Sequence, residues 1–378
     1  MEPLQRKDTE DDKQGMQSNR STVIFAAGAS GGHIFPALAI AKSLKSKKVN
    51  AKTEVKTTFI GSGSKVEKQI LGNKENIEYF HINSSAIRGK GILGALKFLF
   101  ILPSSIFKCL KYYKSNNVKC VLGFGGYPSV IPVLAAKLIG LPIIIQEQNM
   151  YPGFANKFLS KLAKKIFCVP GAKGLPERKI EVMNPVREEF KEVKDYSSNS
   201  NNSEFKLLIM GGSQGAKSLN TAVTNLIETF KEKNFIVTHQ CGEKDFNRIK
   251  KLYTDKNFNA NVVTFISDLP SVFSDIDLII SRAGAMSIAE ISASGRAAVY
   301  VPLNIAGGHQ VENLSDLINS NAALMVKQDD KLVDNLREII VSIDADKIKD
   351  LSSNAKKYYK AQSSSSTSKI VETINEFL

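Results

Sequence analysis

The stretch TVIFAAGASGGHIFPALAIAKSL at residues 22–44 places a short apolar run, a loop of small residues and a helical pattern in direct succession. Thr22–Ala27 is typical of a buried strand, Gly28–Gly32 forms the loop, and Pro36–Leu44 has helical spacing. Glycines between a strand and a helix let backbone N–H groups and the positive helix end approach an anion. The stretch therefore predicts a phosphate-type turn.

The same order of elements begins again in the second half of the chain. The tract KEVKDYSSNSNNS at 191–203 is polar and has almost nothing to bury, which is typical of a linker. It is followed by a strand-like run at Phe205–Met210, the turn GGSQG at 211–215 and a helical pattern at Ala216–Phe230. The chain is therefore predicted to contain two Rossmann-like domains.

Other strand-like runs alternate with helical segments in both halves, at Thr57–Ile60, Val118–Phe124, Pro142–Gln146, Phe235–Thr238, Val262–Phe265, Leu278–Ser281 and Ala298–Val301. This alternation favours an α/β fold with parallel sheets covered by helices, and a ligand cleft between the facing sheet edges. We expect a disordered tail at 1–20, a domain at 21–190, a linker at 191–204, a second domain at 205–365, and a helix at 366–378 that packs back on the first domain.

Composition restricts the class of partner. The 378 residues carry a net charge of +14, which calls for nucleic acid, an acidic membrane surface or a phosphate-bearing substrate. No segment resembles a nucleic-acid-reading motif, so we expect no nucleic-acid partner. The polar N-terminus is unlike a signal peptide, and no run offers the roughly 20 apolar residues of a membrane span. We therefore expect a cytoplasmic protein whose contact with lipid is peripheral.

The four cysteines, Cys109, Cys120, Cys168 and Cys241, have spacings that match no zinc site and no disulfide framework, so we expect reduced, buried thiols. Asp275 and Asp277 could be taken for a metal-binding acidic pair, but they stand at the start of a buried strand, where capping and solvation explain them better. The glycine turns lack both the acidic ribose ligand of dinucleotide sites and the GK[ST] ending of nucleotide triphosphatases. We expect neither a metal nor a cofactor.

Seven motifs in order carry a resemblance to a known family: ASGGHIFPALAIA at 29–41, GFGGYPSVIPVLAAKLIGLPIIIQEQN at 123–149, PGFAN at 152–156, NPVR at 184–187, GGSQGAKSLN at 211–220, RAGAMSIAEISASG at 282–295 and HQVEN at 309–313. Together they resemble the MurG family of bacterial peptidoglycan transferases, which have the two-domain GT-B fold. The resemblance covers residues 22–375. It implies inverting, metal-independent transfer of N-acetylglucosamine (GlcNAc) from UDP-GlcNAc to an undecaprenyl-pyrophosphoryl-linked muramyl pentapeptide, at the cytoplasmic face of the inner membrane.

The resemblance also implies a donor site for UDP-GlcNAc. Ser213 would bind the diphosphate at a helix start, although it also suits a helix N-cap. Arg187 would meet phosphate oxygens, with an exposed ion pair as the alternative, and Glu290 would accept from the ribose hydroxyls, with a helix-dipole role as the alternative. The remaining donor residues are Ser30, Gly31, Gly32, Asn149, Ile266, Ala285, Met286, Ser287, Ile288, Ala289 and Gln310, with His309 beside it.

On the acceptor side, the loop Gly125-Gly126-Tyr127 and the turn Ser30-Gly31-Gly32 resemble the family's loops for the lipid diphosphate, so the latter turn is expected to serve both substrates. Glu147 and Asn156 are also placed there. The attacking sugar hydroxyl must lose its proton, and His33 is the expected catalytic base, with a positioning role as the alternative. Ala29 departs from the family, in which Gly is usual, and this narrows the backbone freedom of the first turn.

The segment Gly91–Lys114 combines large apolar residues with lysines and no acid. This suits an anionic membrane surface, while a pair of buried core helices is the alternative. Its place in the acceptor half favours the membrane, because the acceptor's lipid tail stays in the bilayer. Other cell-wall synthesis proteins remain possible partners.

Three other functions remain open. They are GT-B transfer to another lipid such as diacylglycerol, UDP-sugar epimerisation, and a catalytically silent subunit that recruits a partner to membranes.

Overall fold

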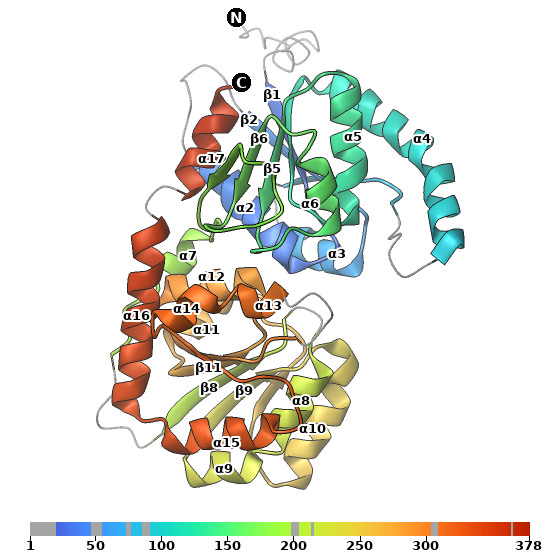
Figure 1. The fold of residues 1–378 in the computed structure, drawn as a ribbon. Coiled ribbons are helices and arrows are strands. Elements are labelled where there is room, and N and C mark those ends of the chain that lie inside the picture. Colours follow the sequence, from blue (N-terminus) through green and yellow to red (C-terminus); the bar gives the residue numbers. More distant parts are fainter. Residues whose placement is uncertain are drawn as a thin grey trace, which may run out of the picture.

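The computed structural model describes residues 20–46, 55–72, 77–84, 91–197, 204–212, 215–303, 309–363 and 366–378. Within these ranges the chain forms two parallel sheets, each packed between helices and stacked one above the other in Figure 1. This confirms the predicted α/β class with two Rossmann-like domains. Of the predicted tail at 1–20, all but residue 20 lies outside the described residues.

The described part of the first domain contains a seven-stranded sheet in the order β3-β2-β1-β4-β5-β6-β7. Its strands are β1 (Ser21–Ala26), β2 (Val55–Gly61), β3 (Glu78–His81), β4 (Val118–Gly123), β5 (Ile143–Glu147), β6 (Lys165–Cys168) and β7 (Lys179–Glu181). Its helices are α2 (Gly31–Ser46), α3 (Lys65–Leu71), α4 (Gly91–Ser115), α5 (Val130–Leu138) and α6 (Phe154–Leu159), with a 3₁₀ turn at Tyr127–Ser129. Phe25 stacks on Phe59 and Phe124 in the core below the first turn.

The second sheet has six strands in the described residues, in the order β10-β9-β8-β11-β12-β13. They are β8 (Phe205–Met210), β9 (Phe235–Gln240), β10 (Asn261–Val263), β11 (Leu278–Ser281), β12 (Ala297–Tyr300) and β13 (Leu324–Met325). The helices of this half are α7 (Glu188–Lys191), α8 (Lys217–Thr224), α9 (Ile227–Glu232), α10 (Phe246–Asp255), α11 (Leu269–Ser274), α12 (Ala285–Ser294), α13 (His309–Glu312), α14 (Ser315–Asn319), α15 (Leu332–Ser342) and α16 (Ala345–Ser363), with a 3₁₀ turn at Glu243–Asp245.

The strand order in each sheet reverses beside its first strand. In the first sheet this point lies between β1 and β4, and in the second between β8 and β11. Ligands of such sheets bind beyond the carboxyl ends of the strands at this point. The loops that leave β1, β4, β8 and β11 there are the four segments that carry the glycine motifs.

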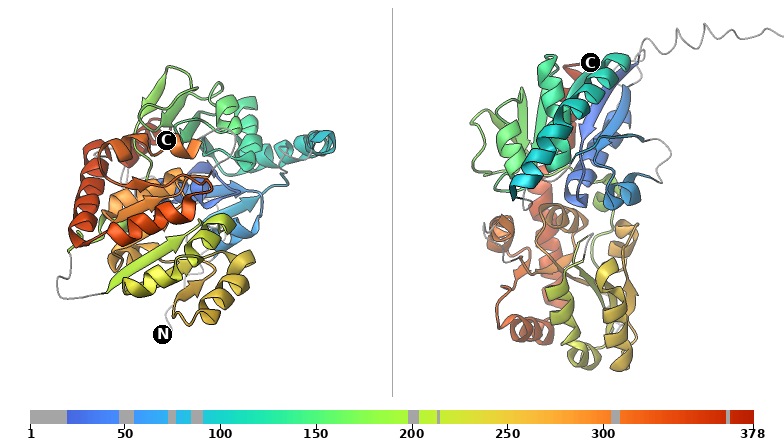
Figure 2. Two further views of the ribbon diagram at one scale, coloured as in Figure 1. Left: turned by 60° about the horizontal axis from the view of Figure 1, so that its bottom comes forward. Right: turned by 90° about the vertical axis from the view of Figure 1, so that its right-hand side faces the viewer.

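One helical segment differs from the sequence prediction, and for a second segment the structure excludes one of the two alternatives. The single helix expected at Ala216–Phe230 is two helices, α8 and α9. The Thr224 hydroxyl donates to the Asn220 carbonyl at the break, a contact that competes with regular helix geometry. The segment Gly91–Lys114 forms one helix, α4, which extends away from the body of the first domain in Figures 1 and 2. Cys109 and Tyr113 are buried while Phe100 and Phe107 are 84% and 68% exposed, so α4 is not a pair of buried core helices. No helix in the described ranges is long and apolar enough to cross a bilayer.

The connections between the halves involve two stretches of chain. The core of the second sheet includes three side chains from the segment around α7: Met183, Val186 and Phe190. Judged by this packing, the border between the two domains lies nearer residue 183 than residue 190. After α16 packs along α12 and β12, α17 (Ser366–Asn375) packs against α2 of the first domain. Ile370, Val371 and Ile374 belong to the first domain's core.

Candidate active site between the two domains

A pocket between the domains brings most of the predicted donor residues together. Its walls come from the first turn and α2, from the loop after β5, and from α12 with the strand ends of the second sheet. The predicted residues that line it are Ser30, Gly31, Gly32, His33, Asn149, Arg187, Ile266, Ala285, Met286, Ser287 and Glu290. A wider adjoining pocket contains Gln310 together with Ser30 and Ser287. The two pockets share part of their walls, and together they are called the cleft between the domains.

His33 stands in the first turn, at the start of α2. Its Nδ1 lies 3.1 Å from the Gly28 carbonyl oxygen and 3.0 Å from Ser30 Oγ. Because a carbonyl can only accept, Nδ1 carries the proton and Nε2 keeps a free lone pair. Burial lowers the pKa of His33, and the hydrogen bond to Gly28 opposes this only in part. The imidazole is therefore neutral at neutral pH, as a proton acceptor must be.

The loop after β4 runs beside His33. Gly125 and Gly126 have φ angles of +90° and +70°, and the second of them lies against the His33 ring. Tyr127 does not line the donor pocket, and its hydroxyl instead lies 3.2 Å from Ser62 Oγ. The first-domain turns that follow β1 and β4 therefore meet at His33.

Glu147 has a different environment from the one expected on the acceptor side. One carboxylate oxygen accepts from the Asn149 backbone and side-chain amides, both at 2.9 Å. The other accepts from Gly153 N at 3.2 Å and from Asn156 Nδ2 at 2.9 Å. Burial raises the pKa of Glu147, while these hydrogen bonds oppose the shift. Glu147 and Asn156 thus shape the loop that presents Asn149 to the pocket.

The second-domain wall of the pocket contains a nearly buried ion pair. Arg187 Nη2 lies 3.1 Å from Glu290 Oε1, and the two side chains are only 13% and 5% exposed. The guanidinium stacks between the rings of Phe35, on α2, and Phe190, on α7, at 4.5 and 4.6 Å from their centroids. Burial raises the pKa of Glu290, and Arg187 opposes the shift. Gly284–Ser287 place the first amides of α12 at the same pocket, where they can face an anion.

Two predicted donor residues lie elsewhere. Residues three and four apart share one face of a helix, so Met286, Ser287 and Glu290 face the pocket together. Ile288 and Ala289 are therefore turned to the opposite side of α12, where they are buried. Ser213 and the side chain of His309 lie outside the described residues. Asp275 pairs with Lys206 Nζ at 2.5 Å, and Asp277 accepts from Lys206 N at 2.7 Å. Both acids are therefore engaged at the start of β8.

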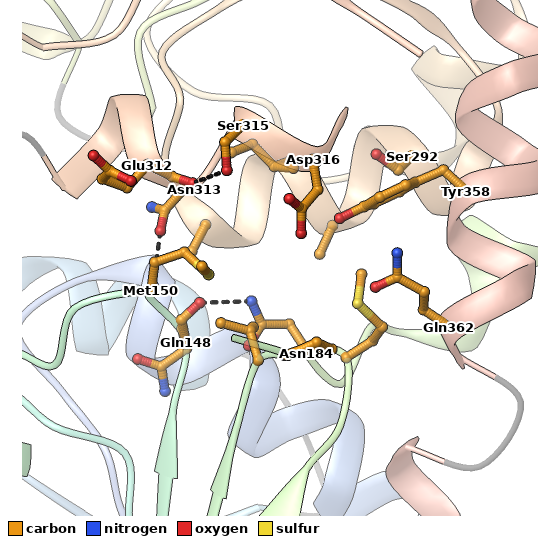
Figure 3. Close-up of a pocket in the computed structure, with 16 residues that line it drawn as sticks. Gln148, Met150, Asn184, Ser292, Glu312, Asn313, Ser315, Asp316, Tyr358 and Gln362 are labelled. Carbon is orange, nitrogen blue, oxygen red and sulfur yellow. Dashed lines mark hydrogen bonds between the residues drawn. The ribbon is translucent and has the colours of Figure 1, made fainter. Parts of the chain in front are cut away.

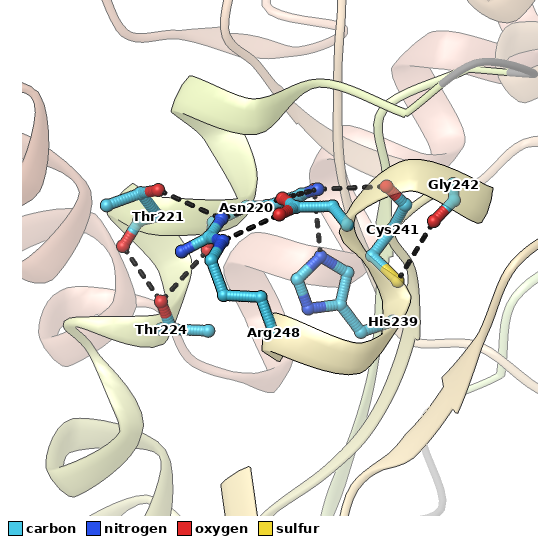
Figure 4. Close-up of polar contacts among 8 residues, drawn as sticks. Asn220, Thr221, Thr224, His239, Cys241, Gly242 and Arg248 are labelled. Carbon is cyan, nitrogen blue, oxygen red and sulfur yellow. Dashed lines mark hydrogen bonds and ion pairs between the residues drawn. The ribbon is translucent and has the colours of Figure 1, made fainter. Parts of the chain in front are cut away.

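The turn after β8 is supported by a buried polar network, shown in Figure 4. Asn220 Nδ2 donates to the Cys241 carbonyl at 2.9 Å, and its Oδ1 lies 3.1 Å from His239 Nε2. A Cβ on Gly215 would come within 2.1 Å of the same Cys241 oxygen, so only glycine lets the turn pass this close. The network therefore fixes the end of the turn that leads into α8.

The domains also meet at a seam beside the cleft, drawn in Figure 3. Asn313, between α13 and α14, accepts from the Met150 backbone N–H at 2.9 Å. Its Nδ2 donates to Asn149 Oδ1 at 3.3 Å. Ile288 and Ala289 line the same seam. Asn149 is thus held by both domains.

Asn313 and Glu67 are among the residues of this arrangement that sequence reasoning missed. Asn313 ends the motif at 309–313 but was given no role, and Glu67 was not considered. The signal for Glu67 was the pattern Ser64-x-x-Glu67, which indicates only the start of a helix. Its carboxylate lies behind the first turn, where it accepts from Ala29 N.

Two Rossmann-like domains that face each other across a pocket lined by glycine-rich turns are typical of the GT-B class of glycosyltransferases. Residues 23–168 match the glycosyltransferase family 28 N-terminal domain, and residues 206–374 match the glycosyltransferase family 28 C-terminal domain. The class is therefore supported independently in each half of the chain.

Related proteins cover nearly the whole chain. The UDP-N-acetylglucosamine–N-acetylmuramyl-(pentapeptide) pyrophosphoryl-undecaprenol N-acetylglucosamine transferase of Francisella philomiragia is 34% identical over 95% of this chain and 99% of its own length. The enzyme of the same name from Francisella tularensis is 35% identical over 90% and 94%. The crystal structure of Acinetobacter baumannii MurG superposes with a TM-score of 0.69 at 29% identity, covering 95% of this chain and 99% of that one. The chain belongs to the MurG family of N-acetylglucosaminyltransferases.

Proposed function

We propose that the chain transfers GlcNAc from UDP-GlcNAc to the muramyl sugar of undecaprenyl-pyrophosphoryl-MurNAc-pentapeptide, the step of peptidoglycan synthesis named in its relatives. The observation that carries the proposal is the single pocket in which His33 meets Arg187, Glu290 and the N-terminus of α12. Each substrate carries a pyrophosphate, and glycine turns from both domains border this pocket.

In the proposed reaction a muramyl hydroxyl attacks the anomeric carbon as the bond to the UDP oxygen breaks. The hydroxyl proton passes to His33 Nε2, and the bonding electrons leave with UDP. Amides at the start of α12 and in the turn after β8 stabilise the developing diphosphate charge. A single displacement from the face opposite UDP inverts the anomeric configuration.

The decisive test separates products after incubating the protein with UDP-GlcNAc, with and without the lipid-linked muramyl pentapeptide. Formation of the disaccharide lipid only in the presence of that acceptor supports the proposal. Transfer to diacylglycerol instead, conversion of UDP-GlcNAc to an epimer without acceptor, or no turnover at all supports one of the three rival functions.

We also propose that the first domain docks on the cytoplasmic face of the plasma membrane. Residues 79–176 contain a single acidic residue, the buried Glu147. Helices α4, α5 and α6 pack side by side there. They expose large apolar side chains between lysines, at Phe100, Phe107, Leu138, Phe154 and Phe158. Apolar insertion and attraction to anionic headgroups add together on such a face.

Vesicle co-sedimentation tests the docking proposal. We expect binding to phosphatidylglycerol-containing vesicles to weaken at least severalfold when Phe107→Ser is combined with Lys111→Ala. The matched control changes Val341, which is 49% exposed in the second domain, to Ser and Lys347 to Ala. Equal binding by both double variants, or binding that ignores anionic lipid content, would contradict this surface.

A further inference from the structure

The carboxylate of Glu67 lies behind the first turn and is fully buried. Its Oε1 accepts from Ala29 N at 2.8 Å and from Ser62 Oγ at 2.7 Å. Its Oε2 accepts from Gly63 N at 2.8 Å and from the Tyr79 hydroxyl at 2.6 Å. Four donors from three separate segments thus converge on one side chain that lines neither cleft pocket.

The backbone around this carboxylate is shaped to admit it. A Cβ on Gly28 would lie 2.4 Å from Glu67 Oε1, and one on Gly61 would lie 2.5 Å from Oε2. Ala29 has a φ of +67°, a left-handed conformation that disfavours residues with a Cβ. The hydrogen bond from Ala29 N to Glu67 holds the residue in this conformation.

The same network reaches both turns beside His33. Because the Ser62 hydroxyl donates its only proton to Glu67, it accepts at 3.2 Å from Tyr127, in the loop after β4. On the other side, Ala29 follows Gly28, whose carbonyl oxygen accepts from His33 Nδ1 at 3.1 Å. One carboxylate therefore connects the first turn, the second loop and the hydrogen bond that sets the His33 tautomer.

A simple helix-capping role does not account for this geometry. Ser64 caps α3 by accepting from Glu67 N, and in a capping box the Glu side chain would return to the Ser64 N–H. Here the carboxylate accepts instead from four groups that all lie outside α3. Its position in α3 brings Glu67 close to the first turn, and its carboxylate accepts hydrogen bonds there instead of capping the helix.

We propose that Glu67 is a positioning residue for the transfer reaction: its carboxylate holds the strained Ala29 turn and thereby aims His33 Nε2 at the acceptor hydroxyl. The inference rests on the proposed transferase function. It assigns to this chain a residue that acts on the reacting groups through the backbone of Gly28 and Ala29, without touching either substrate.

The test replaces Glu67 by Gln. This substitution keeps the side-chain volume but replaces one acceptor oxygen by an NH₂ group, which cannot accept from the two donors that face it. We expect kcat to fall on the order of 10- to 100-fold, as small misplacements of catalytic groups do. UDP affinity should change less than about threefold, because most of the expected uridine contacts lie in the second domain. Amide hydrogen exchange of the peptide that contains Ala29 and Ser30 should accelerate.

Rescue distinguishes positioning from general structural support. Ala29→Gly removes the penalty for a positive φ, so the double variant E67Q/A29G should recover several-fold in kcat over E67Q. The matched control is Glu78→Gln, which also loses a tyrosine-held carboxylate, bonded to Tyr112 and Thr58, but at the outer edge of the sheet. E78Q should leave kcat within about twofold of the wild type.

If E67Q does not fold, Tyr79→Phe removes one of the four donors and should still lower kcat several-fold. The inference is overturned if E67Q or Y79F folds with wild-type kcat and wild-type exchange at Ala29, or if A29G gives no recovery in the E67Q background. Failure of the wild-type protein to transfer GlcNAc would overturn the proposed function instead, and the exchange measurement would still test the turn.

Discussion

Arg187 Nη2 lies 3.1 Å from Glu290 Oε1, although 103 residues separate the two in sequence. Arg187 lies in the segment between β7 and α7, and Glu290 lies in α12. The pair is nearly buried, and Phe35 of the first domain covers the guanidinium. Through Phe35 it therefore links the second domain to the first at the wall of the pocket that also contains His33.

Glu290→Gln is expected to weaken UDP binding by about tenfold or more, measured by calorimetry. The substitution removes a charged acceptor for ribose hydroxyls and leaves the buried Arg187 charge unpaired. Glu228→Gln is the control, because Glu228 pairs with Lys231 on the exposed surface of α9. Equal UDP affinity in E290Q and the wild type would remove Glu290 from the donor site.

His33→Ala is expected to reduce kcat by roughly 10²- to 10⁴-fold, the usual contribution of a general base. UDP affinity should stay within about threefold, because proton transfer plays no part in binding the nucleotide. His81→Ala is the matched control, since His81 is exposed on β3 away from the cleft. Near-wild-type turnover in H33A would show that another group removes the proton.

The pH dependence of kcat/KM provides a second test of His33. Burial lowers the pKa of this histidine below its usual 6.5, so the neutral form that accepts a proton persists into mildly acidic solution. We expect the acid limb of the profile to fall below pH 6.5 in the wild type. An acid limb above pH 6.5 would contradict the role, as would an unchanged limb in the residual activity of H33A.

His239 is expected to make the fold sensitive to acid. Burial lowers its pKa from 6.5 to about 3, so between these values the unfolded chain binds a proton that the folded chain does not. The contribution of His239 to the free energy of unfolding is fully present above pH 6.5. On acidification below that value it falls by about 1.4 kcal/mol per pH unit. Urea unfolding of His239→Gln across pH 7 to 4 should show a correspondingly smaller dependence than the wild type, and an identical dependence would refute the assignment.

Excess chelator is expected to leave the transfer rate unchanged. In the proposed mechanism Arg187, the α12 amides and the turn after β8 would offer positive charge to the leaving diphosphate. Asp275 and Asp277 are engaged with Lys206. The measurement compares initial rates with and without EDTA, with added Mg²⁺ as the control. Loss of activity that Mg²⁺ restores would require a metal in the mechanism.

Local sequence patterns were sufficient to predict most strands. Phe205–Met210 and Leu278–Ser281 were expected at the bounds that the structure has, because a buried parallel strand is a short apolar run ended by turn residues. The break between α8 and α9 was missed, since the apolar spacing continues through it and the Thr224 hydroxyl contacts that accompany it leave no mark in that pattern. Apolar spacing alone also left it open whether the α4 segment was one helix or two.

The site was harder to predict because its contacts join distant segments. The family motifs placed Arg187 and Glu290 together, but nothing in the sequence indicated that Phe35 and Phe190 enclose the guanidinium. Glu67 reaches Ala29 across 38 residues, and a helix-start pattern carries no information about that distance. The motif around Glu290 marked a whole stretch, whereas the helix turns Ile288 and Ala289 away from the pocket.

The return of the C-terminal helix α17 to α2 means that the chain joins the domains at two places, near residue 183 and again between α16 and α17. Any relative motion of the domains must therefore be accommodated at both connections. A change in the angle between the domains would alter the separation of His33 from α12, so both connections bear on the shape of the pocket that these two elements line.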